Sequence, residues 1–471
     1  MNEIKKILPE DAVSNSDDEL ASHADTYWNS HHPTSEQRAK YVVYPSTTED
    51  VSKIMVLCRE HKVPVVPMNG ASSLEGHFIQ TRQGLVIDLS RMNKIKQLNR
   101  DDLDVVVQAG VAWEDLQEFL EPHNLMFGPD PGPGAQIGGM VATSCSGTNA
   151  FRYGTMKENV VNLTVVLADG TVIKTKQRAR KSSAGYNLTG LFIGSEGTLG
   201  VITEATLKLH VKPLKQTIAV VPFNSIYDAT SAVKDILEHG IQLDAMELMD
   251  GKMMECVNAS GETEKVWTEK PTLFFKIGGA SDTIVKELVK SVKEITGKHE
   301  SLKFEFAKSD DEKTELWSAR KVALWSSINY GRKVLDEPAA QLWTTDYAVP
   351  ISKLPSVISE TVKDIEDTGL RCTTVAHAGD ANVHHFIVYT PEQREVAKQV
   401  VERMVKRALA AEGTCTGEHG IGYGKRDYLL WEVGQDTVDL MRKIKMGMDY
   451  YRILNPDKIF QVDPREKTED H

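Results

Sequence analysis

The chain has 471 residues, of which 41% are hydrophobic and 26% charged. This length exceeds a single hydrophobic core and predicts roughly two to four domains. The formal net charge of −12 argues against nucleic-acid binding, which needs clustered Lys and Arg. The acidic excess fits a basic protein partner or simply a water-exposed surface.

The cysteines and the two ends narrow the protein class further. Five scattered cysteines without a CxxC pair exclude a disulfide scaffold and a cysteine-based zinc site, and they fit a reducing compartment. No hydrophobic run reaches the ~18 residues expected of a transmembrane helix. The N-terminal stretch is acidic, so no transit peptide is visible: either the native chain has none or it was removed. We expect both polar ends, PEDAVSNSDDE and DPREKTEDH, to be loosely held.

Residues 42–120 alternate strand and helix patterns. VVYPS is predicted to be a strand that leads into a helix, TTEDVSKIMVLCREHK, capped by Thr47 or Thr48. The buried face of this helix is expected to include Val51, Ile54, Val56 and Leu57. Strand patterns follow in VPVVPM, GLVIDLS and VVVQAG, and a helical pattern in VAWEDLQEFLEP. Short crossovers of this kind indicate an α+β arrangement.

Three loops rich in glycine and small hydroxyl residues lie in the first half of the chain: MNGASSLEG (68–76), GAQIGGMVATSCSGTNAFRYG (134–154) and GSEGTLG (194–200). Backbone N–H groups and small hydroxyls can hold a pyrophosphate without interference from bulky side chains. None of the loops fits the dinucleotide fingerprint or the P-loop. Tight turns explain each loop taken singly, whereas the three together favour a large phosphate-bearing cofactor.

After Pro213 strand patterns alternate with longer helical patterns, which predicts a domain boundary near residues 212–217. In this half VAHAGDANVHHFIVY is predicted to form two strands joined by the turn residues GDAN. On one uninterrupted strand His377 and His384 would face opposite sides, because they are seven residues apart. A turn between them lets both rings meet at one point.

A second His-bearing loop, EGTCTGEHGIGYGK, contains Glu418 and His419. Two histidines and one glutamate are a common ligand set for Zn²⁺ or a similar divalent ion, although each histidine taken alone is better explained as an ordinary residue. Adjacent side chains point apart in an extended segment, so one of the two could bind the metal while the other faces a substrate. Arg320, on the predicted helix TELWSARKVALW, needs an anion, either a substrate carboxylate or an internal Asp or Glu.

Several of these stretches resemble the FAD-linked oxidoreductases of the vanillyl-alcohol oxidase/PCMH superfamily, and within it the mitochondrial, fungal-type D-lactate dehydrogenases (cytochrome). The most specific are GPDPGPGAQIGG, SCSGTNAFRYGTMKEN, RKSSAGYNLTGLFIGSEGTLG, HAGDANVH and GTCTGEHGIGYGKR. The resemblance runs from about His23 to Phe460. It implies an α+β fold with a two-subdomain PCMH-type FAD-binding domain, then a ferredoxin-like α+β substrate (cap) domain and a helical C-terminal portion. The implied ranges are an N-terminal segment at 1–37, the FAD-binding domain at 38–213, and a substrate- and metal-binding FAD-oxidase C-terminal domain at 214–471.

The resemblance also implies the site residues. FAD would be bound noncovalently, since the first loop has no histidine placed for flavin attachment. The residues expected to line FAD are Asn69, Gly70, Ala71, Ser72, Ser73, Gly138, Gly139, Thr143, Ser146, Gly147, Tyr153, Gly154, Glu196, Gly197, Gly200, Ile202 and Asn455. One divalent metal, with Zn²⁺ favoured over Mn²⁺, would be bound by His377, His384 and Glu418. His419 matches the catalytic base, and Arg320 matches the arginine that holds the substrate carboxylate.

Some positions depart from the family pattern. Ala376 and Ala381 stand where glycines are usual, and His385 stands where a small or apolar residue is more common. If the turn needs a positive φ at Ala381, the alanine costs of order 1 kcal/mol and can shift His384. The loop MNGASS lacks a usual second glycine, which can weaken FAD binding.

The function implied is FAD-dependent oxidation of D-lactate to pyruvate. A metal would lower the pKa of the substrate hydroxyl, His419 would remove its proton, and the hydride would pass to flavin N5. Electrons would go to cytochrome c, a basic protein that an acidic surface attracts, and the location would be mitochondrial. Thr344 and Thr345 stand where relatives acting on 2-hydroxyglutarate have a lysine, which favours a short monocarboxylate.

Three alternative functions remain open. One is a FAD-dependent dehydrogenase of another D-2-hydroxy acid, such as 2-hydroxyglutarate or glycolate. A second is a flavin-free, metal-dependent hydrolase, which predicts a colourless protein, and a third is a non-catalytic binding protein. Only flavin-dependent oxidation uses both domains.

Overall fold

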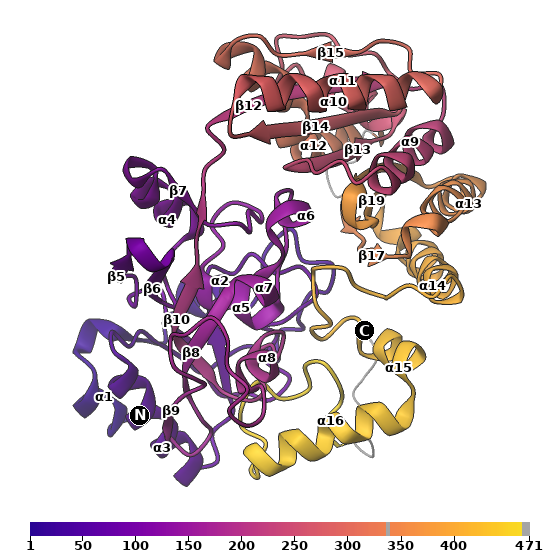
Figure 1. The fold of residues 1–471 in the computed structure, drawn as a ribbon. Coiled ribbons are helices and arrows are strands. Elements are labelled where there is room, and N and C mark those ends of the chain that lie inside the picture. The colour runs from indigo at the N-terminus through magenta and orange to yellow at the C-terminus, as the bar shows by residue number, and fades with distance from the viewer. Residues whose placement is uncertain (336–339, 464–471) are drawn as a thin grey trace. The chain divides into compact units, whose positions relative to one another are not determined.

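The computed structural model describes residues 1–335 and 340–463, which form two compact units (Figure 1). Unit 1 comprises residues 1–147 and 154–211 together with the chain from His419 onward, and unit 2 comprises residues 148–153 and 212–418. Both mix helices and sheets, so the expected α+β class is confirmed. The units are assembled from separate stretches of chain, whereas the ranges expected from the sequence, 38–213 and 214–471, are continuous.

Unit 1 contains two main sheets. Its strands are β1 (Val13–Ser14), β2 (Tyr41–Val43), β3 (Val65–Met68), β4 (Leu85–Asp88), β5 (Ile95–Asn99), β6 (Asp104–Gln108), β7 (Leu125–Met126), β8 (Val160–Val166), β9 (Val172–Lys174), β10 (Val201–Lys208) and β11 (His210–Val211). One sheet has the order β1-β2-β4-β3, with β2, β4 and β3 parallel. The other has the order β5-β6-β10-β8-β9 and is antiparallel throughout. Strand β7 pairs with β11.

The helices of unit 1 include α3, whose start follows the expected capping pattern. They are α1 (Ile4–Ile7), α2 (Asp17–Ser22), α3 (Thr48–Glu60), α4 (Trp113–Leu120), α5 (Ile137–Thr143), α7 (Met156–Asn159), α8 (Leu188–Phe192), α15 (Arg426–Val433) and α16 (Gln435–Met448). Thr47 and Asp50 form a capping box at the start of α3. The prediction for its buried face was wrong at Val56, which is 38% exposed. The buried positions are Val51, Ile54, Met55 and Cys58. They follow the three- and four-residue spacing of one helix face, and Val56 lies off that face.

The N-terminal segment is packed, so the expectation of a loosely held end was wrong there. Residues 464–471, which make up nearly all of the C-terminal stretch DPREKTEDH, lie outside the described residues. Ile4, Leu8 and Ala12 are buried in a core of unit 1, and Val13 pairs with Val43 in the first sheet. The prediction relied on the polar composition of this stretch. It overlooked that Ile4, Leu8 and Ala12 are spaced four residues apart and reach the core.

Unit 2 is built on one antiparallel sheet. Its strands are β12 (Lys215–Pro222), β13 (Ala245–Met249), β14 (Thr272–Gly279), β15 (Glu305–Phe306), β16 (Gln341–Thr344), β17 (Tyr347–Ala348), β18 (Arg371–His377) and β19 (Asn382–Tyr389). Its helices are α6 (Ala150–Tyr153), α9 (Ile226–Glu238), α10 (Gly251–Ser260), α11 (Asp282–Lys298), α12 (Asp310–Leu335), α13 (Leu354–Asp367) and α14 (Arg394–Ala410). The strand order is β15-β12-β14-β13-β18-β19-β16, with β17 also paired to β19. Every residue of β13 and β19 is buried, so both faces of these strands are covered.

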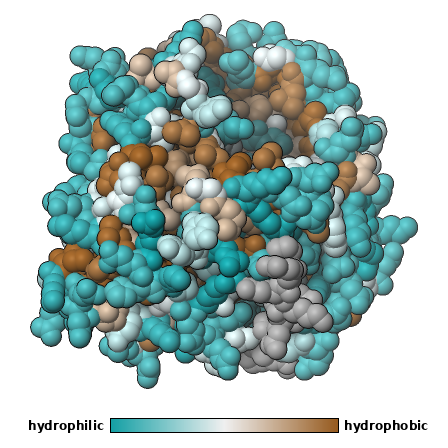
Figure 2. All heavy atoms as spheres, turned by 90° about the horizontal axis from the view of Figure 1, so that it is seen from below, coloured by the Kyte–Doolittle hydropathy of each residue, from teal (hydrophilic) through white to brown (hydrophobic). Residues whose placement is uncertain are grey.

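One face of the molecule is largely polar. Figure 2 shows one face on which hydrophilic residues predominate and hydrophobic residues form separate patches. This agrees with the share of charged residues, 26%. Within the described residues, none of the helices combines the length and the hydrophobicity that a membrane crossing requires.

Candidate functional site

The hairpin of β18 and β19 brings two histidines together. A 3-10 turn at Ala378–Asp380 joins the strands, and Ala381 adopts the left-handed conformation with φ 53°. The register sets Val375 opposite His384, so His377 shares a sheet face with His384. The two rings lie 5.5 Å apart and nearly perpendicular, as the predicted turn required.

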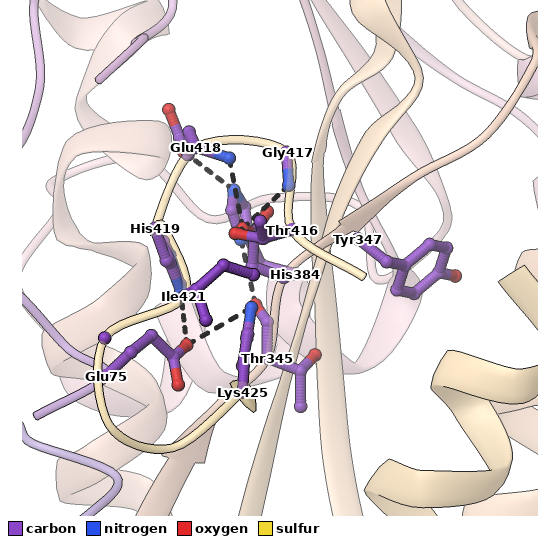
Figure 3. A network of polar contacts seen from close by, with 12 residues as sticks. Glu75, Thr345, Tyr347, His384, Thr416, Gly417, Glu418, His419, Ile421 and Lys425 are labelled. Atoms are coloured by element: carbon purple, nitrogen blue, oxygen red, sulfur yellow. Dashed lines mark hydrogen bonds and ion pairs between the residues drawn. The ribbon is translucent and has the colours of Figure 1, made fainter. Parts of the chain in front are cut away.

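Glu418 completes a cluster with these histidines. Its Oε1 atom lies 3.1 Å from His377 Nε2 and 3.0 Å from His384 Nε2. One ligand atom from each residue lies within 4.8 Å of the others, and Figure 3 shows Glu418 and His384 directed toward each other. Two imidazole nitrogens and one carboxylate oxygen form a donor set that suits Zn²⁺ and leaves room for a further ligand. The residues present therefore fit a divalent metal.

The other ring nitrogen of each histidine is held by the protein. Glu247 contacts His377 Nδ1 at 2.9 Å, and the carbonyl oxygen of Thr345 lies 2.9 Å from His384 Nδ1. Such contacts direct Nε2 toward a metal, as in other metal sites. Burial alone lowers the pKa of His377, but the carboxylates of Glu247 and Glu418 outweigh it and raise that pKa well above its usual value. The two imidazoles likewise overcome the burial of Glu418 and hold its pKa well below the usual range.

Asp346 organises the backbone that presents Glu418. Its Oδ2 atom accepts hydrogen bonds from the Thr416 hydroxyl at 2.6 Å, from Gly417 N at 2.8 Å and from Glu418 N at 3.0 Å. Its Oδ1 atom accepts one from Asn382 Nδ2 at 2.6 Å. The carboxylate is buried, so these donors compensate the desolvation of its charge.

Arg320 has an internal partner. Its Nε atom donates to Glu247 Oε2 at 2.9 Å, and its side chain is 17% exposed. The sequence left two possible anions for Arg320, a substrate carboxylate and an internal Asp or Glu. In the structure Glu247 is the internal partner, and it binds the Nε atom. A substrate carboxylate on the terminal nitrogens stays a prediction.

In unit 1, His419 is held by a buried carboxylate. Glu75 Oε1 lies 3.2 Å from His419 Nδ1 and 3.3 Å from Lys425 Nζ (Figure 3). Its Oε2 lies 3.4 Å from His31 Nε2. Burial by itself raises the pKa of Glu75, but Lys425, His31 and His419 outweigh it and hold that pKa far below its usual range. Glu75 is therefore an anion that fixes the His419 ring through Nδ1.

Sequence reasoning missed Glu75, Glu247 and Asp346. Glu75 had a weak signal, because it lies in the glycine loop MNGASSLEG. Glu247 and Asp346 lie in or next to ordinary strands and had no local signal.

The first glycine loop, Asn69–Ser73, follows β3 and has the features of an anion cradle. Gly70 and Ala71 have positive φ, and the amides of Gly70, Ser72 and Ser73 donate to no protein acceptor within the described residues. Backbone donors of this kind suit a pyrophosphate.

The second loop lies against the first. Gly138 and Gly139 begin helix α5, and a Cβ on them would lie 2.6 Å from Asn69 Oδ1 and 3.1 Å from Asn69 O, respectively. Only glycine allows this approach at Gly138, and the two loops together fit a phosphate-bearing cofactor.

The remaining expected cofactor residues fall into two groups. Thr143 ends α5, and Ser146, Gly147 and Gly154 follow it in unit 1, whereas Tyr153 belongs to unit 2. Burial and the neighbouring Asp244 raise the pKa of Tyr153 to about 12.

The second group surrounds Glu196. Its two carboxylate oxygens accept hydrogen bonds from Ile421 N and Gly422 N, both at 2.7 Å, so they hold the loop that follows His419. Asn455 Nδ2 donates to the Glu196 carbonyl at 2.7 Å. Gly197, Gly200 and Ile202 lie at or beside the start of β10.

The departures from the family pattern are accommodated locally. Ala376 is an ordinary buried strand residue, whereas Ala381 does occupy the strained conformation anticipated. His385 is buried, with Nδ1 3.0 Å from the Thr374 hydroxyl and Nε2 3.1 Å from the Tyr347 hydroxyl. Burial and the nearby His384 and Arg407 lower the pKa of His385 to about 3, so its ring is a neutral packing group.

Comparison with known proteins identifies the class. The profile for the C-terminal domain of FAD linked oxidases matches residues 212–459, and a FAD binding domain profile matches residues 39–176. The chain belongs to the FAD-linked oxidases, which are flavin-dependent oxidoreductases, and carries their FAD-binding domain.

Two relatives of high identity show which members of the family the chain is similar to. The chain is 58% identical to the mitochondrial D-lactate dehydrogenase [cytochrome] of Kluyveromyces lactis, over 98% of this chain and 81% of that protein. It is 56% identical to the mitochondrial D-lactate dehydrogenase [cytochrome] 1 of Saccharomyces cerevisiae, over 100% of this chain and 81% of that protein. The resemblance to fungal-type members is therefore confirmed, and the expected mitochondrial location agrees with these names.

Solved structures confirm the fold. The 4-ethylphenol oxidase of Gulosibacter chungangensis has a TM-score of 0.80 at 16% identity, over 98% of this chain and 97% of that one. p-Cresol methylhydroxylase has a TM-score of 0.76 at 16% identity, over 98% of this chain and 96% of that one. At such identities the likeness concerns the fold alone.

Proposed function

We propose that the protein oxidises D-lactate to pyruvate with FAD as the hydride acceptor, assisted by one divalent metal, and passes the electrons to cytochrome c. The observation that carries the proposal is the consecutive pair Glu418 and His419. Glu418 forms the cluster with His377 and His384, while the next residue in the chain is fixed by the buried Glu75. The names of the two relatives at 56–58% identity support D-lactate as the substrate and a cytochrome as the acceptor.

FAD would be held noncovalently by the backbone of Asn69–Ser73 and by Gly138 and Gly139, and would supply an acceptor for the C2 hydride at N5. A metal on His377, His384 and Glu418, Zn²⁺ in preference to Mn²⁺, would polarise the substrate hydroxyl.

The chain's own residues bind the substrate and move its proton. Arg320 binds the substrate carboxylate with its terminal nitrogens, while Glu247 holds Nε. His419 accepts the hydroxyl proton; since Glu75 holds Nδ1, we assign this proton to Nε2. Two neighbouring features favour a short substrate: the hydroxyl of Thr345 is engaged with the backbone of His385, and no lysine stands at 344 or 345. The net charge of −12 would attract a basic acceptor such as cytochrome c.

The test is an anaerobic visible spectrum of the purified, FAD-loaded protein before and after addition of D-lactate, with L-lactate as the stereochemical control. We expect the oxidised-flavin band to bleach with the D isomer alone, and the reduced protein to reduce added cytochrome c. A flavin band that bleaches with glycolate or D-2-hydroxyglutarate but with neither lactate would replace the substrate and keep the reaction class. A protein that binds no FAD would refute the proposal and favour the hydrolase or binding alternatives.

A further inference from the structure

We propose that Glu247 is a positioning residue that sets both the metal ligand His377 and the carboxylate-binding Arg320 with a single buried carboxylate. The inference rests on the proposed function for the role of Arg320 and extends it. According to this inference, both metal binding and substrate binding depend on the side chain of Glu247.

The sheet register brings Glu247 to His377. Strands β13 and β18 are antiparallel neighbours in which Glu247 lies directly opposite His377. Glu247 shares its strand face with Ala245 and Met249, which belong to the same apolar core as Trp317 and Ala319 of helix α12. Helix α12 also carries Arg320, so the carboxylate lies between the histidine on the sheet and the arginine on the helix. Its side chain is only 1% exposed.

The contacts use both oxygens of the carboxylate. Oε1 and Oε2 lie 2.9 and 3.0 Å from His377 Nδ1, and Oε2 also accepts from Arg320 Nε at 2.9 Å. A carboxylate only accepts hydrogen bonds, so His377 Nδ1 carries a proton. In the neutral ring that a metal binds, the proton therefore stays on Nδ1 and the lone pair of Nε2 serves as the ligand. The bond to Arg320 Nε fixes the plane of the guanidinium. Within the described residues its terminal nitrogens have no acceptor, which fits a carboxylate ligand supplied from outside the chain.

A glutamine at position 247 could not serve both partners. Its amide has one accepting oxygen and one donating nitrogen, and both His377 Nδ1–H and Arg320 Nε–H are donors. If the oxygen faces His377, the NH₂ group opposes Arg320. If it faces Arg320, the NH₂ group donates to His377 Nδ1, which moves the ring proton to Nε2 and blocks the metal position. Glu247→Gln should therefore weaken both kinds of binding, although it touches neither the metal nor the substrate.

The experiment measures binding rather than turnover. Zn²⁺ affinity is measured by competition with a chromophoric chelator. Pyruvate affinity is measured on the metal-stripped, FAD-loaded protein, from the change in the flavin spectrum. Two further variants separate the metal measurement from the substrate measurement. Asp346→Ala should lower Zn²⁺ affinity alone, because Asp346 acts through Glu418, and Arg320→Lys should lower pyruvate affinity alone. Glu247→Gln should lower Zn²⁺ affinity by roughly 10–100-fold and pyruvate affinity by about tenfold or more.

The outcomes are decisive in each direction. A Glu247→Gln protein that loses one affinity only, or neither, would overturn the assignment. Should Glu247→Gln fail to fold by circular dichroism, Glu247→Asp takes its place: the charge remains but the reach is shorter by one methylene, so both affinities should fall by smaller factors. Wild-type affinities in Glu247→Asp would then overturn the assignment. If neither lactate isomer bleaches the flavin band of the wild type, D-lactate is not the substrate. The Zn²⁺ affinities of the variants then still decide whether Glu247 positions His377.

Discussion

Asp346→Ala tests whether a buried carboxylate places Glu418, the proposed metal ligand. The substitution removes the acceptor of four hydrogen bonds, from Asn382, Thr416, Gly417 and Glu418. Two of the donors are backbone amides, and a buried amide without an acceptor costs about 1–3 kcal/mol. Partial relaxation of the loop and entry of water reduce the sum, so we expect the free energy of unfolding to fall by roughly 2–4 kcal/mol. Zn²⁺ affinity should fall by about 10–100-fold because Glu418 is no longer fixed.

Asp346→Asn is the matched control, because it keeps the volume and one accepting oxygen. The new NH₂ group would oppose the Asn382 NH₂ group, and rotation of the Asn382 amide restores that contact but loses the hydrogen bond from Asn382 Nδ2 to the Tyr347 carbonyl at 3.0 Å. We expect a loss of only about 1 kcal/mol. Urea titrations give the stability of each variant, and chelator competition gives its Zn²⁺ affinity. An Asp346→Ala protein that is destabilised as expected but binds Zn²⁺ like the wild type would show that Glu418 is placed independently of Asp346.

Three further predictions concern the turn, a buried helix cap and the metal. Ala381→Gly relieves about 1–2 kcal/mol of left-handed strain, but it loses a buried methyl worth about 0.8 kcal/mol and adds about 0.4–1 kcal/mol of unfolded-chain freedom. The free energy of unfolding from urea titration should therefore change by less than about 1 kcal/mol, and a larger loss would show that φ 53° is not strained here. Asp250 is buried at the start of α10 and accepts from Met253 N, and burial raises its pKa to about 6. A raised carboxyl pKa means that the folded protein binds the proton more tightly than the unfolded chain, so ionisation destabilises the fold above pH 6 by roughly 3 kcal/mol. Asp250→Asn should thus be the more stable protein near pH 8, with an advantage that shrinks as the pH falls from about 6 toward 4; an advantage independent of pH would contradict the shift. Chelation of the metal should abolish D-lactate oxidation and leave the circular dichroism spectrum unchanged, because Glu247, Thr345 and Asp346 hold the cluster without it. Added Zn²⁺ should restore activity, and unfolding on chelation would make the metal structural instead.

The sequence was informative wherever the determinant is local. The spacing of His377 and His384 around a four-residue turn was enough to predict that their rings meet, because a hairpin fixes that geometry over a few residues. The glycine clusters likewise indicated close backbone approach, and Gly138 does lie against Asn69. The family resemblance added residue roles that no local pattern contains.

The parts that sequence reasoning missed depend on long-range register. Glu247 meets His377 across 130 positions of sequence, because β13 and β18 are neighbours in a sheet whose strand order does not follow the chain. Asp346 meets Glu418 across 72 positions. A one-residue shift of the β13–β18 pairing would turn Glu247 to the other face of the sheet, and no pattern within β13 itself specifies which partner it meets.

Glu75, Glu247 and Asp346 share one physical arrangement. Each is a carboxylate removed from water, which is unfavourable unless cations or several donors surround it. In each case the compensating groups include a residue assigned to chemistry or its backbone: His419 for Glu75, His377 and Arg320 for Glu247, and the Glu418 amide for Asp346. Displacing any of these groups would leave a buried charge without its partner, so the fold resists their movement even when no ligand is bound. The same contacts that compensate the buried charges therefore preorganise the groups proposed to bind metal and substrate, which is the condition for efficient catalysis by positioning.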